Sequence, residues 1–212
     1  IKNFHNTIWR YENEFIPVVQ ADKADRAVNC GEEIKFVMHR REDCKKLVEL
    51  IEKGELPLRV THNDTKLNNV LFDSDSDDAI CVIDLDTVMP GLALYDFGDS
   101  IRFGANSCAE DDDNYDKVEL MLDYFEAYAK GFLSEAGDAL NQCEIDNLAF
   151  SAKLMTFECG MRFLTDYLNG DTYFKTAYPE HNLVRAKNQF ALVADMERKM
   201  EQMQQIIKNI TE

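Results

Sequence analysis

The sequence contains no long hydrophobic run and no recognisable targeting segment. None of its 212 residues belongs to an uncharged apolar stretch of about 18 residues, whereas a membrane-spanning helix needs about 20. Residues 1–5 lack the basic and then apolar layout of a signal peptide. We therefore expect a soluble, cytoplasmic protein that binds no membrane. Because 45% of the residues are apolar, the chain can build one large domain or two small ones.

Basic residues are scarce, and closely spaced cysteines are absent. Lys and Arg number 23 against 40 Asp and Glu, which gives a net charge of −17. This balance argues against nucleic acid as a partner, because phosphate backbones are bound by clustered Lys and Arg. The six cysteines include no Cys-x-x-Cys pair, which excludes the usual zinc and redox motifs. We expect free thiols in a reducing compartment.

Hydrophobic spacing predicts a chain dominated by helices. Residues 1–31 give a mixed signal, which we interpret as a leading segment with one helix. Apolar residues then recur at intervals of three and four, and they predict helices over residues 32–53, 118–132, 148–163 and 183–210. Gly54 is placed to end the first of these helices. The last helix carries a methionine-rich seam, which indicates core packing or a homodimer contact.

Two short apolar runs, residues 69–72 and 79–83, predict strands. The acidic link between them, residues 73–78, has the composition of a turn. The chain is interrupted again at residues 89–91, and residues 95–102 are predicted to be a loop that enters a helix. Together these elements predict a predominantly helical α+β fold with a small β-hairpin.

One stretch, Thr61–Asp73, holds residues with a specific chemistry. Its spacing His-x-Asp-x-x-x-x-Asn places Asp64 and Asn69 on one loop, and Asp84 ends the next apolar run. A phosphoryl-transfer enzyme needs a carboxylate that takes the proton of the acceptor hydroxyl and oxygen ligands for magnesium. Among buried apolar neighbours, Asp84 would be costly without such a role. The pattern therefore predicts half of a magnesium-dependent phosphoryl-transfer site.

This stretch is open to other interpretations. Asp64 and Asn69 can cap turns, and Asp84 can cap a helix, since such residues are common in an acidic chain. The acidic link begins like an EF-hand calcium loop, but Asp78 replaces the required Gly and Asp84 the required Glu. The Asp-x-Asp pattern of Asp84 and Asp86 also matches many glycosyltransferases. That interpretation leaves Asp64 and Asn69 without a role.

Three segments resemble the aminoglycoside phosphotransferase and choline kinase superfamily, which shares the protein-kinase-like fold: residues 62–73, 82–86 and 94–99. Within this superfamily, residues 160–171 are most similar to the N-acetylhexosamine 1-kinases. The resemblance implies the C-terminal catalytic lobe of that fold, with ATP as the phosphoryl donor and Mg²⁺ as the cofactor. It also implies a small-molecule sugar acceptor that is phosphorylated on its anomeric hydroxyl.

The resemblance also implies roles for individual residues. It implies that Asp64 is the catalytic base, and that Asn69 and Asp84 bind the magnesium of the nucleotide. It implies contact between Lys66 and the transferred phosphoryl group, while a solvated surface lysine is an equal alternative. For Asp86, a sugar or metal contact and a purely structural turn both stay open.

Arg162 is the candidate for a substrate contact from the helical part of the chain. It lies four residues after Glu158 and four before Asp166, which favours an ion-pair ladder on one helix face. The alternative is a hydrogen bond to a sugar hydroxyl or acetamide, for which the five donors of an arginine are suited. Three further residues are expected to be structural braces of the loop: His62, Asp96 and Asp99.

Glycine is sparse as well, with nine residues, none before Gly31 and none in a Gly-x-Gly or Walker spacing. Kinases of this kind cover the ATP phosphates with a Gly-rich loop and a strand lysine of a smaller N-terminal lobe. We therefore expect a leading segment over residues 1–31 and a helical catalytic lobe over residues 32–212, without the nucleotide lobe. Such a fragment is expected to be nearly inactive alone.

Other functions stay open on these residues. A non-catalytic pseudokinase or binding module would keep the fold without turnover, and a choline or aminoglycoside kinase would share the loop. A role in the desulfation of mucin sugars is a further alternative. A sulfatase, however, needs Cys or Ser followed by Pro and Arg at intervals of two, and none of the four prolines lies in such a motif.

Overall fold

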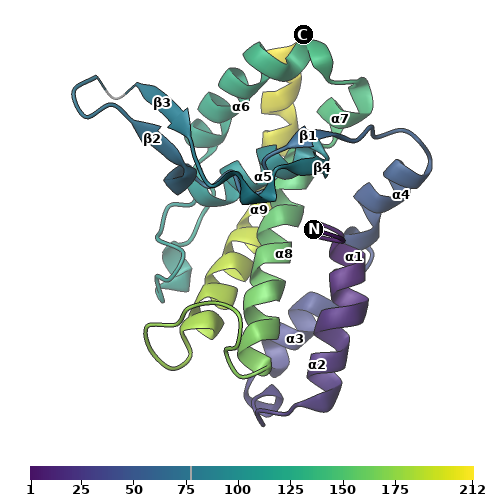
Figure 1. Ribbon diagram of the computed structural model, residues 1–212, viewed down its shortest axis with the longest axis vertical. Helices are drawn as coiled ribbons and strands as arrows, with labels where there is room; N and C mark the ends of the chain where they lie inside the picture. Colours follow the sequence, from purple (N-terminus) through teal and green to yellow (C-terminus); the bar gives the residue numbers. More distant parts are fainter. Residues whose placement is uncertain (77) are drawn as a thin grey trace.

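The fold is built around two long helices that run side by side. The computed structural model describes residues 1–76 and 78–212. α8 (Leu148–Leu168) and α9 (His181–Thr211) form the central pair in Figure 1, with the purple N-terminal helices along one side and α6 near one end. The β2–β3 hairpin projects from this helical body. The structure confirms the predicted α+β fold of predominantly helical, kinase-like type.

A glycine allows α8 and α9 to approach closely. A Cβ atom at Gly160 of α8 would lie 2.8 Å from the ring of Phe190 on α9, so any larger residue would push the two helices apart. The methionine-rich seam of α9 is buried in the same core, with Met196 and Met203 at 0% exposure. The seam therefore serves core packing, the first of its two predicted uses, and the homodimer stays a prediction.

The leading segment forms a helix that packs against the core. Asn6 caps its start, because the Asn6 side chain accepts a hydrogen bond of 3.0 Å from the N–H of Trp9. The helix consists of α1 (Thr7–Arg10), a π-helical turn (Tyr11–Phe15) and α2 (Ile16–Ala21). Pro17, which lacks an N–H, lies inside this helix and follows the π-helical turn. Phe15 is fully buried, so this segment belongs to the same core as the rest of the chain.

The prediction of one helix over residues 32–53 is wrong. α3 (Gly31–Met38) and α4 (Lys46–Glu52) are separated by a turn. Within this turn, Arg40 donates two hydrogen bonds, of 3.0 and 2.7 Å, to the carboxylate of Glu197 on α9. This bidentate contact holds the turn against α9, and it outweighs the weak helical preference of the intervening residues.

The strands of the described residues form two antiparallel pairs: β1 (Arg59–Thr61) with β4 (Met89–Gly91), and β2 (Val70–Phe72) with β3 (Ala79–Val82). The β2–β3 hairpin was predicted. The predicted acidic turn includes residue 77, which lies outside the described residues. The β1–β4 pair was missed, because both strands have only three residues and β4 contains Pro90, which is unfavourable inside a sheet.

α5 (Ala93–Gly104) includes residues 95–102. These residues were predicted to be a loop that enters a helix, but all of them are helical. A Cβ atom at Gly98 would lie 2.5 Å from the carbonyl oxygen of Ser151 on α8, which indicates close packing of α5 on α8. The end of the helical body is completed by α6 (Leu122–Ala136) and α7 (Gln142–Asp146). In the described residues, each helix is too short or too polar to span a membrane.

Candidate active site

One carboxylate of α5 holds the loop that follows β1. The two oxygens of Asp96 accept the backbone N–H groups of His62 (2.9 Å) and Asn63 (2.7 Å). Burial raises the pKa of Asp96 above its usual value, although these two donors act in the opposite direction. These contacts fit the brace expected of Asp96. Asp99 differs from the expectation, because it pairs with Arg102 of its own helix at 2.8 Å.

His62 connects this loop to the strand that leads to Asp84. Its Nε2 lies 2.9 Å from the carbonyl oxygen of Ile83, and its Nδ1 lies 3.2 Å from the N–H of Asp64. Since Nδ1 accepts a hydrogen bond, Nε2 carries the proton and donates to Ile83. The hydroxyl of Thr87 donates to the carbonyl oxygen of His62 at 2.6 Å. These contacts fit the expected brace and fix Asp64 relative to Asp84.

Lys66 and Asn69 converge on one oxygen of Asp64. Lys66 Nζ and Asn69 Nδ2 each lie 2.9 Å from Oδ2 of Asp64. The side chain of Asp64 is 28% exposed, so a bound molecule can reach it. Because both donors contact Oδ2, the other oxygen, Oδ1, is left for an acceptor hydroxyl. Asn69 is 5% exposed, and its Oδ1 accepts no hydrogen bond from the described residues.

Asp84 reaches the site from the end of β3. Its backbone is left-handed, with φ 60° and ψ 56°, and it leads into a 3₁₀ turn. The apolar residues beside it are exposed, Val82 by 54% and Leu85 by 60%. Asp84 therefore does not lie among buried apolar neighbours, and the prediction that its carboxylate would be costly there is wrong. The left-handed backbone, which Asp adopts more readily than most residues, turns the chain from β3 into the 3₁₀ turn.

The candidate metal ligands fit a magnesium ion that is bound together with a nucleotide better than a metal ion that is held by protein ligands alone. Asn69 offers an amide oxygen and Asp84 a carboxylate, which are ligand types that Mg²⁺ prefers. Among the described residues, no group of three or more His, Cys, Asp or Glu side chains forms a metal site. Mg²⁺ bound with a nucleotide needs only one or two protein ligands, because phosphate oxygens and water complete its coordination.

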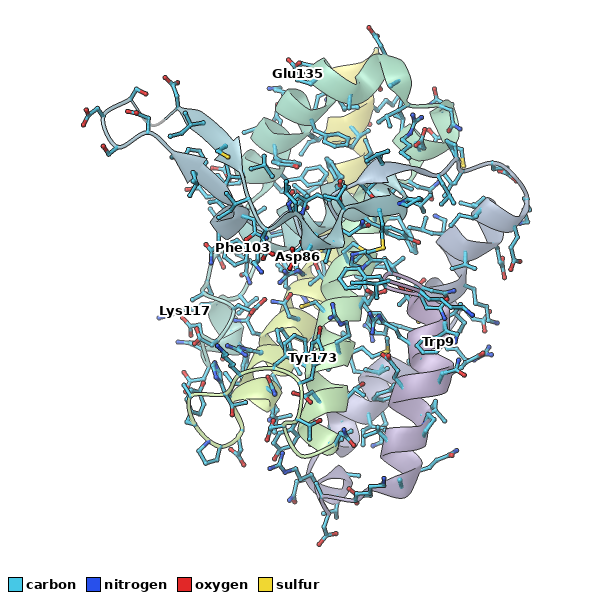
Figure 2. All side chains as sticks on the ribbon, viewed as in Figure 1. Trp9, Asp86, Phe103, Lys117, Glu135 and Tyr173 are labelled. Atoms are coloured by element: carbon cyan, nitrogen blue, oxygen red, sulfur yellow. The ribbon has the colours of Figure 1, made fainter. Side chains whose placement is uncertain are left out.

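A cavity of about 580 Å³ joins the loop to the helical part of the chain. From the loop and the β3 end, its charged lining residues are Asp64, Lys66 and Asp84. From α8, the α8–α9 connection and α9, they include Arg162, Lys175 and Arg185. Figure 2 labels Asp86 near the loop and Tyr173 on the side of the α8–α9 connection. The cavity thus brings together Asp64, Lys66, Asp84 and Arg162 from the predicted set.

The acidic residues on the helical side of this cavity already have partners. Arg102 pairs with Asp99 at 2.8 Å and with Glu110 at 2.5 Å. Glu158 accepts hydrogen bonds from His5 at 2.8 Å and from the hydroxyl of Thr7. On this side the lining holds four Arg or Lys side chains, Arg102, Arg162, Lys175 and Arg185, against three carboxylates, Asp99, Glu110 and Glu158. The helical side of the cavity is therefore positive, although the chain as a whole is strongly acidic.

Two of these cations were missed in the sequence. Arg185 contacts oxygens of uncharged groups, the carbonyl of Lys175 at 3.2 Å and the amide of Asn182 at 3.4 Å. Its Nε is buried without a hydrogen-bond partner. Lys175 lies in the exposed connection that precedes α9. No local motif marks either residue, and the scarcity of cations in this chain was the one signal that could have drawn attention to them.

The ion-pair ladder expected around Arg162 does not form within the described residues. Both oxygens of Glu158 are occupied by His5 and Thr7, and Asp166 accepts the backbone N–H groups of residues 172–174. The Arg162 guanidinium instead lies between two aromatic rings, 5.7 Å from the centroid of Phe4 and 5.5 Å from that of Phe174. Its hydrogen-bond donors therefore remain for a ligand in the cavity.

Asp86 is placed differently from the other candidates. It lies in the 3₁₀ turn Leu85–Thr87 and is exposed. It is not among the residues that line the cavity with Asp64. Of the two open interpretations, this position favours the structural turn.

The chain was compared with models of known protein families. The model of the family described as the phosphotransferase enzyme family, APH, matches residues 5–131. The match includes Asp64, Lys66, Asn69 and Asp84 and ends before Arg162. It covers more than half of the 212 residues. The chain therefore belongs to the APH phosphotransferase enzyme family.

Proposed function

We propose that this protein is an ATP- and magnesium-dependent kinase that phosphorylates a small sugar, with the anomeric hydroxyl of an N-acetylhexosamine as the acceptor. One observation carries the proposal. The cavity that contains the carboxylate of Asp64 continues to a positively charged wall with Arg162, Lys175 and Arg185. Such an arrangement can hold a hydroxylated acceptor between a base and a set of hydrogen-bond donors.

Asp64 acts as the general base in this proposal. Its Oδ1 takes the proton of the acceptor hydroxyl while the hydroxyl oxygen attacks the terminal phosphorus of ATP, and the bond from that phosphorus to ADP breaks, so that ADP leaves. The hydrogen bonds from Lys66 and Asn69, both 2.9 Å, hold the carboxylate through Oδ2. Lys66 is also placed to offset negative charge on the transferred group.

Asn69 and Asp84 hold the magnesium in this proposal, through one amide oxygen and one carboxylate. Bound magnesium supplies positive charge that offsets the charge on the transferred phosphoryl group. The distance between Asp84 and the loop is set by the His62–Ile83 hydrogen bond of 2.9 Å. Loss of this brace would therefore disturb the metal ligands without removing one.

The cations on the helical wall of the cavity support a sugar over other acceptors of related kinases. Choline is a cation and aminoglycosides are polycations, and both would meet the uncompensated charges of Arg162, Lys175 and Arg185. A neutral acceptor avoids this repulsion. The forked donors of Arg162 suit the hydroxyl and acetamide oxygens of an N-acetylhexosamine.

The test follows ADP release by the full-length gene product, so that any segment beyond residues 1–212 is present. The protein is incubated with Mg-ATP and N-acetylglucosamine, N-acetylgalactosamine, choline or an aminoglycoside. We expect turnover with the two sugars, and a loss of about 10²-fold or more in Asp64→Asn. Asp75→Asn, an exposed residue of the hairpin link, is the matched control.

Two outcomes would contradict the proposal. Faster turnover with choline or the aminoglycoside than with the sugars would overturn the acceptor class. Binding of Mg-ATP in calorimetry without ADP release from any acceptor would favour the non-catalytic binding module. Equal activity of Asp64→Asn and Asp75→Asn would remove the assignment of the base.

A further inference from the structure

A second cavity adjoins the proposed acceptor site. It has a volume of about 520 Å³ and lies between the N-terminal helix and α8 with the connection that follows it. The two cavities share a wall, because five residues line both: Ile1, Phe4, Arg162, Tyr173 and Phe174. Figure 2 shows Trp9 on the purple N-terminal helix and Tyr173 on the side of the α8–α9 connection, and both line this second cavity.

The lining of the second cavity has the chemistry of a sugar-binding site. Two aromatic side chains present accessible surface, with Trp9 37% and Tyr173 71% exposed. Amide and hydroxyl groups lie on the same lining, from Asn13, Asn169 and Thr165. Aromatic faces provide a flat apolar contact for the C–H face of a sugar ring, and amides and hydroxyls bond its hydroxyl groups.

Arg162 is placed to serve both cavities. Its guanidinium is held between the rings of Phe4 and Phe174, at 5.7 and 5.5 Å from their centroids. The nearby carboxylates of Glu158 and Asp166 are occupied by other donors. An arginine has five N–H donors in a planar fork, so it can bond one sugar unit on each side of the wall.

The stereochemistry of a sugar indicates which substituents of the acceptor extend toward the second cavity. In a pyranose ring, C4 lies directly across the ring from the anomeric carbon C1, and C3 is the neighbour of C4. An acceptor whose C1 hydroxyl faces Asp64 therefore directs C3 and C4 away from the catalytic loop. The Arg162 wall is contributed by α8 and its neighbours and not by that loop. A substituent on C3 or C4 of the acceptor would thus extend toward the second cavity.

We propose that the second cavity is a subsite for the second sugar unit of a disaccharide whose reducing-end sugar is phosphorylated on C1. This inference rests on the proposed sugar kinase function and extends its acceptor from a single sugar to a β-linked disaccharide. Trp9 and Tyr173 contact the faces of the second ring, and Arg162 bonds the oxygens around the linkage.

Trp9 provides the readout, because it is the only tryptophan in the 212 residues. N-acetylglucosamine and its β1,4-linked dimer, diacetylchitobiose, are titrated into the full-length protein. Affinity is measured by calorimetry and the surroundings of Trp9 by fluorescence, with Trp9→Phe identifying its part of the signal. We expect the dimer to bind about tenfold more tightly than the monomer. The fluorescence of Trp9 should change with the dimer and not with the monomer.

Trp9→Ala tests the second subsite without touching the acceptor site, because Trp9 lines the second cavity and not the first. This variant should bring the affinity for the dimer to about that of the monomer and leave monomer binding unchanged. Tyr124→Ala is the matched control, because Tyr124 is an exposed tyrosine of α6 that lines neither cavity. Circular dichroism spectra of both variants should match that of the unchanged protein.

The outcomes separate this inference from the function on which it rests. If the monomer binds, and the dimer binds equally tightly to the unchanged protein and to Trp9→Ala, the second subsite is overturned and the sugar kinase proposal stays in place. Absence of binding by both sugars would overturn both proposals.

Discussion

His5 is predicted to stabilise the catalytic loop as a buried, protonated imidazole. Its Nδ1 lies 2.8 Å from a carboxylate oxygen of Glu158, and its Nε2 lies 2.9 Å from the backbone carbonyl of Asn63, the residue before Asp64. Both partners are acceptors when Glu158 is ionised, and a neutral imidazole has only one N–H. The two hydrogen bonds therefore require a charged ring. His5→Gln removes that charge from a pair that is almost completely buried.

The expected loss of stability follows from the burial of this pair. The side chains of His5 and Glu158 are 5% and 0% exposed, and removal of one partner from a buried ion pair costs about 3–5 kcal/mol. Two contacts with Glu158 remain in the variant, the hydroxyl of Thr7 and Arg10 at 3.8 Å. We therefore expect about 3 kcal/mol, which is a large fraction of the stability of a typical domain.

Urea unfolding, with linear extrapolation to water, measures this free energy. His39→Gln is the control, because His39 is exposed and its replacement should leave the stability unchanged within about 0.5 kcal/mol. The double variant of His5→Gln and Glu158→Gln should lose less than the sum of the single variants by about 1 kcal/mol or more. Equal stability of the His5→Gln and His39→Gln proteins, or strict additivity in the double variant, would refute the charged pair.

Three further predictions concern the frame of the site. Gly98→Ala should lower the free energy of unfolding by about 1–3 kcal/mol, because its Cβ would lie 2.5 Å from the carbonyl oxygen of Ser151; unchanged urea unfolding would contradict the close packing. Asp166→Ala should lower the melting temperature and the affinity for the acceptor, since Asp166 accepts three backbone N–H groups of residues 172–174; calorimetry measures both. Burial raises the pKa of Glu158. The charge and hydrogen bond of its histidine partner, together with nearby arginines, lower the pKa by more than burial raises it, so the pKa lies below its usual value. The stability that this carboxylate contributes is therefore present above about pH 4.3 and lost as the pH falls through the folded-state pKa; the fall in stability between pH 6 and pH 3 should be smaller in Glu158→Gln.

The catalytic loop could be predicted because its contacts are local. Asp64, Lys66 and Asn69 lie within six residues of one another, so their spacing alone brings their side chains to one point. The hairpin that follows is local as well. Hydrophobic spacing was also sufficient for α9, because one face of this helix is buried along most of its length.

The contacts that sequence spacing could not reveal join distant parts of the chain. The break between α3 and α4 depends on Arg40 and Glu197, which are 157 residues apart. Arg162 is left without an ion pair because His5 occupies Glu158 from 153 residues away. Spacing on one helix predicts which side chains can meet, but it contains no information on a competitor from another segment.

The base and the acceptor wall come from separate parts of the chain. Asp64, with its proposed metal ligands, belongs to the loop and hairpin between β1 and the turn after β3, whereas Arg162 belongs to α8. Substitutions in α8 can change the size and charge of the accepted molecule while the chemistry of phosphoryl transfer is retained. Such a division lets new substrate ranges evolve stepwise, through variants that keep some activity at every stage.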